Sequence, residues 1–285
     1  MGIYLEPEQT TPTSALPQDF ALRMVSGLVL GLAALLLTWS GLWPFTIFVL
    51  GVALLVVWEW GRIVRQAGAD TIFWASSISV AAACALAAIG MTGLGAIAIV
   101  VGAILAALLG FGHRGHLSAL GVLYAGLPAV SLIWLRSSVM WGFAGVLFLF
   151  LVVWAADTGA YAAGRTFGGP KLASRISPNK TWTGLIGGIG AAVLVGVIVG
   201  LVLDGGHSGR LAIMAFVLAL AAQAGDIVES ALKREHGVKD ASELIPGHGG
   251  FMDRVDGLIF AAVLAALWGL AINVHNPARA LLMWN

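Results

Sequence analysis

Residues 211–256 read LAIMAFVLALAAQAGDIVESALKREHGVKDASELIPGHGGFMDRVD, an apolar run that passes directly into a densely charged segment. Residues 211–228 are long and apolar enough for a membrane-spanning helix, which needs about 17–25 such residues. The stretch from Ser230 to Asp256 then gathers acids, bases and a glycine-rich turn, although only 10% of the chain is charged. This contrast predicts a helical membrane protein with a polar site at the membrane surface, suited to a metal ion and nucleotide phosphates.

The composition of the whole chain excludes an ordinary soluble protein. Of its 285 residues 59% are hydrophobic, whereas soluble domains are about 45–50% apolar and about 25% charged. The 11 Trp and 38 Gly suit membrane helices, because Trp favours the interfaces and Gly allows close helix contact. The one cysteine, Cys84, lies in an apolar run, so we expect a packing residue rather than a disulfide or a thiolate metal ligand.

The predicted fold class is all-α, a polytopic integral membrane protein with about nine transmembrane helices. The predicted spans are about 20–39, 42–60, 72–90, 94–111, 118–135, 140–157, 183–203, 211–228 and 257–274. Residues 1–19 are polar, contain three prolines and carry acids rather than bases, which predicts a disordered tail and not a secretory signal. Residues 20–285 are predicted to form a single transmembrane helical domain.

The distribution of basic residues predicts a cytoplasmic N-terminus and a C-terminus outside. If the N-terminus and every even-numbered connection share one side, all 15 Lys and Arg residues except Arg136, Arg210 and Arg279 fall there. Such an excess marks the cytoplasmic side. The two long polar connections, 158–182 and 229–256, contribute most of it and are predicted to face the cytoplasm.

The first long connection starts where Asp157 closes the sixth predicted span. Ser177 and Pro178 are predicted to cap and begin the seventh helix, since both residue types favour helix starts. A helix start with nearby bases attracts phosphate. Lys171 and Arg175 fit a phosphate site, and they fit equally well a basic loop beside anionic lipid headgroups.

A row of polar residues leaves the eighth predicted span. Asp226, Glu229, Ser230 and Lys233 stand at positions i, i+3, i+4 and i+7, so they share one helical face. Asp226 lies close to hydrocarbon depth, where a carboxylate is costly and usually functional.

Two further acids, Asp253 and Asp256, fall in the predicted first turn of the ninth helix. The helix dipole favours acids there, but the intervening Arg254 and the glycine turn upstream exceed what capping requires. With Asp157 and Asp226, they come from the ends of three spans at one membrane face. Hard oxygen ligands suit Mg²⁺, and the neighbouring bases suit a polyphosphate. We therefore predict a magnesium and phosphate site.

Three histidines leave alternatives open. His248, flanked by glycines, could bind phosphate or donate a proton. His113 and His116 have the spacing of a metal pair, but no acid or cysteine lies nearby. A polar loop at the membrane interface is the favoured interpretation for that pair.

The polar segments strongly resemble the phosphatidate cytidylyltransferases, also called CDP-diacylglycerol synthases. That family's signature is S-x-x-K-R-x-x-x-x-K-D followed by P-G-H-G-G-x-x-D-R-x-D. The matching positions are Ser230, Lys233, Arg234, Lys239, Asp240, Pro246, Gly247, His248, Gly249, Gly250, Asp253, Arg254 and Asp256. Further matches are Asp157–Tyr161, Gly164-Arg165, Phe167-Gly168 and Ser177–Trp182. The resemblance covers about 153–257, the predicted catalytic half, and departs at Thr183 and Gly257, where relatives commonly have Glu and Ser.

The resemblance implies a nucleotidyltransferase that transfers CMP from CTP to phosphatidate, giving CDP-diacylglycerol and pyrophosphate in phospholipid biosynthesis. The implied catalytic residues are Asp226, Asp253, Lys233, Arg234, Lys239, His248 and Arg254. The implied substrate-binding residues are Ser177, Lys180, Thr181, Arg165, Ser230, Gly249 and Gly250. Asp226 and Asp253 are expected to hold Mg²⁺ with support from Asp157 or Asp256, and a second cation stays open.

The same resemblance implies a homodimer. The apolar spans and the distribution of bases predict a multi-pass protein of the inner (plasma) membrane whose active site faces the cytoplasm. CTP, phosphatidic acid and the lipid bilayer are the expected partners, and nucleic acid is not. One alternative is a CTP-dependent polyprenol or dolichol kinase, and another is a CDP-synthase for ether-linked lipids. A cation transporter using Asp226 and Asp157 is a third, disfavoured because these acids stand at span ends beside basic loops.

Overall fold

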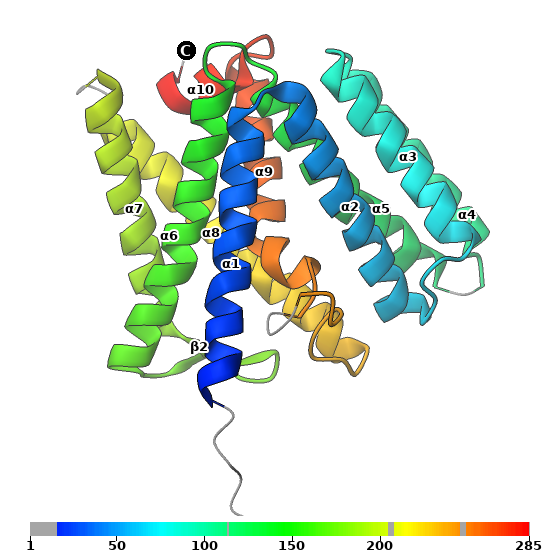
Figure 1. Ribbon diagram of the computed structural model, residues 1–285, viewed down its shortest axis with the longest axis horizontal. Coiled ribbons are helices and arrows are strands. Elements are labelled where there is room, and N and C mark those ends of the chain that lie inside the picture. The colour runs from blue at the N-terminus through cyan, green and yellow to red at the C-terminus, as the bar shows by residue number, and fades with distance from the viewer. Residues whose placement is uncertain (1–15, 113, 205–207, 246–248, 285) are drawn as a thin grey trace, which may run out of the picture.

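The computed structural model describes residues 16–112, 114–204, 208–245 and 249–284. Within these ranges the chain forms a bundle of helices with one short two-stranded hairpin (Figure 1). The elements are α1 Leu16–Trp39, α2 Leu42–Arg65, α3 Thr71–Ala88, α4 Thr92–Leu109, α5 Gly115–Arg136, α6 Gly142–Phe167, β1 Lys171–Ala173, β2 Ser177–Thr181, α7 Trp182–Asp204, α8 Ser208–Glu235, α9 Met252–Ile272 and α10 Pro277–Met283.

The helices confirm an all-α, multi-pass membrane protein. Among the described residues, eight helices, α2 to α9, are long and apolar enough to cross a membrane. They correspond to eight of the nine predicted spans. The remaining predicted span, 20–39, lies within α1, which contains the shorter apolar segment Val25–Trp39. Helix α1 begins at Leu16, inside the segment 1–19 that was predicted as a tail; residues 1–15 are outside the described ranges, and the sidedness of the termini stays a prediction.

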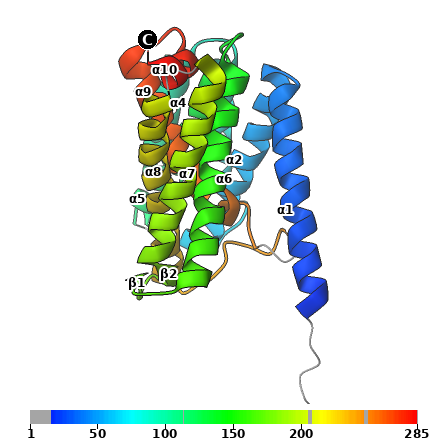
Figure 2. The same cartoon turned by 90° about the vertical axis from the view of Figure 1, so that its left-hand side faces the viewer.

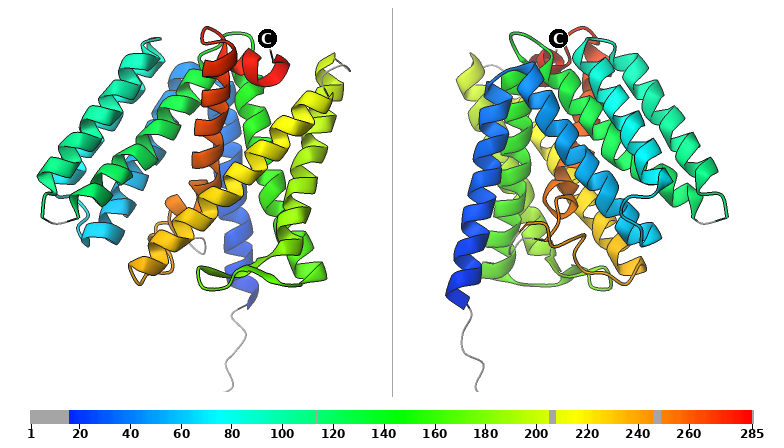
Figure 3. Two further views of the ribbon diagram at one scale, coloured as in Figure 1. Left: turned by 180° about the vertical axis from the view of Figure 1, so that it is seen from behind. Right: turned by 45° about the vertical axis from the view of Figure 1, so that its right-hand side comes forward.

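Helix α9 occupies the centre of the bundle. It packs against α2, α5, α6, α8 and α10, and α8 crosses obliquely beside it (Figure 3). Helices α3 and α4 lie at one flank and α7 at the other. Helix α1 stands at the edge of the bundle, where it packs against α2 and α6 (Figure 2). This arrangement brings the start of α9 close to the polar end of α8.

Small residues allow the closest helix contacts. A Cβ atom at Gly225 of α8 would collide with the carbonyl oxygen of Asp256 on α9. A Cβ atom at Gly188 of α7 would lie 2.5 Å from the carbonyl oxygen of Ala156 on α6. Such positions let helix backbones meet inside a membrane. Gly188 therefore serves helix packing between α6 and α7.

Two helices continue past their predicted membrane boundaries. Asp157 does not close the sixth span, as the sequence suggested, because α6 runs on to Phe167. The residues after Asp157 are more polar but still compatible with a helix, and the helix ends only at Gly168, whose φ of +61° favours glycine. Helix α8 likewise continues beyond residue 228 to Glu235.

The predicted helix start at Pro178 is wrong. Ser177–Thr181 is strand β2, paired antiparallel with Lys171–Ala173. Pro178 is tolerated because a two-stranded hairpin leaves one side of each strand without a partner. Helix α7 instead begins at Trp182, and the Oγ1 of Thr181 accepts a hydrogen bond from the Gly184 amide at 3.1 Å. Thr181 therefore does the capping that the sequence assigned to Ser177.

Candidate active site

Three carboxylates meet where α8 and α9 converge. Asp226 and Glu229 of α8 and Asp256 of α9 each offer an oxygen within 4.8 Å of the others. The spacing of Asp226 and Glu229 places them on one face of α8, and the close approach at Gly225 brings Asp256 to that face. Glu229 is buried, and the other two are half-buried. We call these three residues the carboxylate cluster.

The β-hairpin reaches the carboxylate cluster through Lys180. Its Nζ lies 2.5 Å from Oδ2 of Asp226, in a pair that is mostly shielded from solvent. Ser230 donates to the other oxygen of Asp226 over 3.3 Å. The structure thus brings together the two long polar connections, which are separate in sequence, around Asp226.

Asp253 lies beside the carboxylate cluster, but both of its carboxylate oxygens have donors from the protein. Its Oδ1 pairs with Lys233, whose Nζ also lies 2.9 Å from Oε2 of Glu229. Its Oδ2 accepts hydrogen bonds from the amides of Ala241, at 3.0 Å, and Gly250, at 2.8 Å. Oδ2 of Asp253 therefore holds the loop that precedes α9, while Oδ1 is paired with Lys233 of α8. Glu229 stands among the clustered acids where the sequence suggested Asp253.

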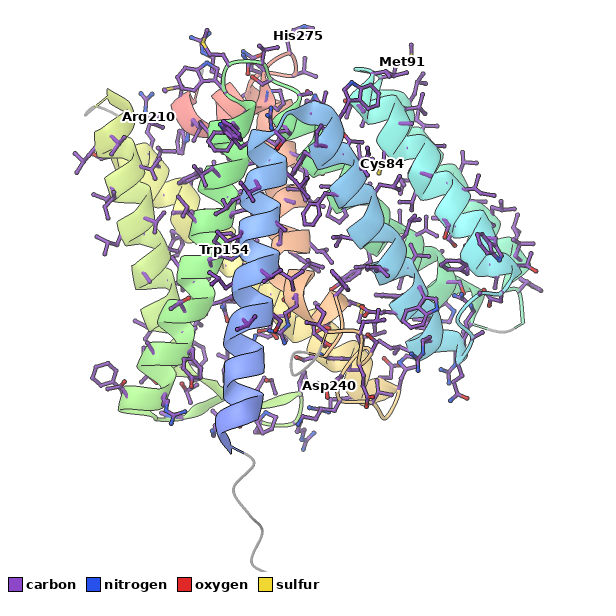
Figure 4. The ribbon with its side chains drawn as sticks, in the orientation of Figure 1. Cys84, Met91, Trp154, Arg210, Asp240 and His275 are labelled. Atoms are coloured by element: carbon purple, nitrogen blue, oxygen red, sulfur yellow. The ribbon has the colours of Figure 1, made fainter. Side chains whose placement is uncertain are left out.

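Asp157 and Arg254 border a half-open cavity of about 640 Å³ between α1, α2, α5, α6 and α9. Most of its wall is apolar and includes Gly31 of α1 and Trp154 of α6, which Figure 4 labels on α6. Asp157 and Arg254 are both exposed to this space, together with Thr158. Asp157 also lies within electrostatic range of Asp226 and Arg254. The cavity consequently joins an apolar interior to the charged site.

The remaining predicted bases are more exposed. Arg234 donates to the carbonyl oxygens of Ile176 and Val238, each at 3.3 Å, and so ties the end of α8 to the hairpin. Lys239 is exposed beside Asp240, which Figure 4 shows at the opposite end of the bundle from His275.

For four of the predicted substrate-binding residues, the contacts described are not with the carboxylate cluster. Arg165 is exposed and donates to the hydroxyl of Tyr161 at 3.0 Å. Thr181 is buried as the cap of α7, and Ser177 is half-buried in β2. Gly249 has a φ of +80°, which favours glycine.

The glycine turn is described only in part. The amide of Ile245 donates to the carbonyl oxygen of Gly249 at 2.9 Å and closes the turn. His248, with Pro246 and Gly247, lies outside the described residues, and so does His113. His116 is in α5.

Sequence analysis missed Glu59, a fully buried residue of α2. Its Oε1 accepts from the hydroxyl of Ser242, at 2.5 Å, and from the amide of Phe251, at 2.9 Å. Its Oε2 accepts from the amide of Met252 at 2.6 Å. One signal could have found it: an acid inside an apolar span is costly and usually has a function. Glu229 was placed on the polar face of α8, but not among the metal ligands.

The carboxylate cluster fits a hard divalent cation. Three carboxylates close together repel one another unless positive charge lies between them. The Oε1 of Glu229 is buried, and among the described residues it has no hydrogen-bond partner. Mg²⁺ prefers oxygen ligands and usually takes few from the protein, leaving room for water and substrate phosphates. The donor set therefore suits Mg²⁺.

Comparison with known proteins places the chain among membrane nucleotidyltransferases. The family model described as "Cytidylyltransferase family" matches residues 21–271. A protein of Brucella suis biovar 1 named phosphatidate cytidylyltransferase is 41% identical over 251 residues, covering 87% of this chain and 92% of the relative. Proteins of the same name from Haemophilus influenzae and Staphylococcus saprophyticus are 46% identical over 122 residues and 40% identical over 146 residues. These two matches cover 41% and 51% of this chain, and 42% and 55% of the relatives.

Proposed function

Because this chain belongs to the cytidylyltransferase family, we propose that it is a phosphatidate cytidylyltransferase. It transfers CMP from CTP to phosphatidate and releases pyrophosphate, which makes CDP-diacylglycerol for phospholipid biosynthesis. The observation that carries this proposal is the apolar cavity that ends at Asp157 and Arg254 beside the carboxylate cluster. A lipid with a charged headgroup matches both parts of that site.

The cavity explains how a lipid can react at a polar site. Moving an acyl chain into water costs about 0.8 kcal/mol for each methylene group. The wall that includes Gly31 and Trp154 keeps an acyl chain in apolar surroundings, while the headgroup phosphate reaches Arg254 at the charged end. The tail therefore need not leave the hydrophobic layer during the reaction.

The chemistry needs charge neutralisation more than a strong base. A phosphate oxygen of phosphatidate attacks the α-phosphorus of CTP, and the bond to the leaving pyrophosphate breaks. A phosphate monoester has a second pKa of about 6 and is largely dianionic at neutral pH. The difficulty is that two anions must approach. Lys180 and Arg254 at the site, with the more exposed Arg234 and Lys239, supply positive charge for this step.

Asp226, Glu229 and Asp256 would hold Mg²⁺, whose charge, when bound, stabilises phosphate oxygens and the leaving group. This ligand set differs from the sequence-based one, in which Asp253 took the place of Glu229. Asp253 positions the loop before α9 by accepting from the Ala241 and Gly250 amides, and Lys233 pairs with its other oxygen. A second cation remains compatible with Asp157 nearby.

The proposed membrane placement and assembly rest on the distribution of basic residues and on the family resemblance. The excess of basic residues supports an active site that faces the cytoplasm, where CTP is, in the inner (plasma) membrane. The homodimer rests on the family resemblance.

The deciding experiment follows the label from CTP into lipid. The purified protein is incubated in detergent with Mg²⁺, with CTP labelled at either the α- or the γ-phosphate, and with phosphatidate or, in a parallel reaction, a polyprenol or dolichol; the lipid products are then separated. We expect only the α-label to enter a CDP-lipid. Transfer of the γ-label to a polyprenol or dolichol would identify a kinase instead. Absence of labelled lipid from folded protein would refute the proposed function.

A further inference from the structure

We propose that Glu59 of α2 is a positioning residue for the reaction, which fixes the start of α9 and the loop before it. The inference rests on the proposed function, because the segment that Glu59 holds carries Asp253, Arg254 and Asp256. No signature position includes Glu59, and it lies in the half of the chain with the weaker resemblance.

The hydrogen bonds of Glu59 match the needs of a helix start. The first amide groups of a helix lack partners within the helix. Phe251, at the N-cap of α9, supplies no capping side chain. The two oxygens of Glu59 instead accept from the Phe251 and Met252 amides, at 2.9 and 2.6 Å. A carboxylate there is also favoured by the helix dipole, so α9 is capped by another helix of the bundle.

Glu59 also holds the loop that leads to α9. The hydroxyl of Ser242 donates to its Oε1 at 2.5 Å. A Cβ atom at Gly250 would collide with that same oxygen, so the loop backbone passes directly against the carboxylate. Glu59 therefore contacts the loop at both ends of the turn, and Asp253 accepts from the Ala241 and Gly250 amides within the same loop.

The position of Glu59 bears directly on the reacting groups. Arg254 and Asp256 follow Met252 by two and four residues, within the first turns of α9. A rotation or shift of this helix start would move Asp256 away from Asp226 and Glu229. A misplacement of about 1 Å can cost about 100-fold in rate. We therefore expect loss of Glu59 to lower kcat without contact between Glu59 and either substrate.

The main test is Glu59→Gln, which keeps the size of the side chain but presents an amide N–H₂ to one of its backbone donors. We expect kcat to fall about 10- to 100-fold, with KM for CTP changed less than about threefold. Hydrogen exchange, followed by mass spectrometry, should accelerate in peptides covering 241–257 and stay unchanged in α3 and α4. Glu235→Gln, at the exposed end of α8, is the matched control and should keep wild-type kinetics.

A purely stabilising role would give a different pattern. It would raise exchange throughout the bundle and lower the yield of folded protein, while kcat per folded molecule stayed normal, and that result would overturn the proposal. If Glu59→Gln does not fold, Glu59→Asp keeps the charge and withdraws it by one methylene. Normal kcat in folded Glu59→Asp would equally overturn it. Hydrogen exchange can be measured without turnover. If the wild-type protein had no activity, the proposed function would be refuted, but the effect of Glu59 on the start of α9 could still be tested.

Discussion

Two acidic regions lie side by side at the start of α9 and differ in how their charges are satisfied. In the carboxylate cluster, three acids approach within 4.8 Å of one another, and a buried oxygen of Glu229 lacks a hydrogen-bond partner among the described residues. In the loop region, Asp253 and Glu59 have donors on every carboxylate oxygen. Among the described residues, the first region therefore leaves one buried carboxylate oxygen without a donor, and the second region leaves none.

This difference separates acids that can bind a cation from acids that stabilise the fold. A carboxylate that accepts several backbone amides is satisfied by the fold and stabilises it. Carboxylates that crowd together without enough donors cost free energy, and a bound cation removes that cost. Membrane surroundings make both situations more consequential, because water is scarce there.

Of the changes proposed here, removal of divalent cations should lower turnover the most. Chelation with EDTA is expected to stop CDP-lipid formation completely, since the carboxylate cluster loses its counter-charge. Mg²⁺ at 100 times its Kd should restore turnover and stabilise the folded state by about 2.7 kcal/mol, through binding linkage. Turnover and the thermal unfolding midpoint with and without Mg²⁺ measure both effects. Unchanged turnover in EDTA would refute a metal role for the cluster.

Asp256→Asn should separate catalysis from stability. Removing one of the three clustered charges weakens cation binding, and we expect turnover to fall by roughly 10²–10³-fold. Without Mg²⁺ the unfolding midpoint should hold or rise, because repulsion with Asp226 and Glu229 is relieved. Asp70→Asn, between α2 and α3, is the control and should retain turnover. A large drop in the unfolding midpoint would instead show that Asp256 stabilises the fold, as Asp253 and Glu59 do.

Asp253→Asn should show the opposite pattern. The new amide group would face the Nζ of Lys233, donor against donor, so we expect a loss of about 1–3 kcal/mol in stability. Turnover should fall only about tenfold, as a result of a displaced loop, and the Mg²⁺ concentration for half-maximal turnover should not change. Kinetic titration with Mg²⁺ measures the turnover and the half-maximal Mg²⁺ concentration, and thermal unfolding measures the stability. Abolished turnover at an unchanged midpoint would return Asp253 to the metal ligands, as the sequence suggested.

The membrane fold was predictable because apolar length determines it directly. Runs of about 20 apolar residues require helices that cross the bilayer, and eight such helices are present in the described residues. The helix ends were less predictable. Polarity marks where the membrane ends, not where a helix ends, and α6 therefore continues ten residues beyond Asp157, to Phe167.

The site was predictable where its geometry is local. The spacing of Asp226, Glu229 and Lys233 on α8 placed all three on one face before any tertiary contact was known. Which acid pairs with a base depends on how α8 meets α9, and that contact is set by Gly225 and the loop before α9. Glu59 lies 183 residues from Ser242, so no local pattern could connect them.

The smallest expected effect concerns Asp70, the N-cap of α3, which accepts hydrogen bonds from Arg65 and the Phe73 amide and is not part of the carboxylate cluster. Burial acts to raise its pKa, but bonds from Arg65 and the Phe73 amide outweigh this, so the pKa lies below its usual value. A lowered folded pKa gives stability that is present above the unfolded pKa of about 3.9 and is lost as pH falls through the folded pKa. Asn also caps helices well, so Asp70→Asn should keep the bond from the Phe73 amide to Oδ1 and lose the negative charge together with the Oδ2 acceptor for Arg65.

We expect Asp70→Asn to cost at most about 1 kcal/mol at neutral pH, since the ion pair with Arg65 is partly open to solvent. The difference in unfolding midpoint between wild type and variant should shrink as pH is lowered below about 4. Thermal unfolding between neutral and acidic pH measures it, with salt added as a check on screening. A difference that persists at low pH would mean that Asp70 acts through its hydrogen bonds from Arg65 rather than through its charge. Acids that have hydrogen-bond donors would then stabilise this protein through those bonds and not through their charge. The two kinds of acid would then differ only in that the carboxylate cluster binds a metal ion.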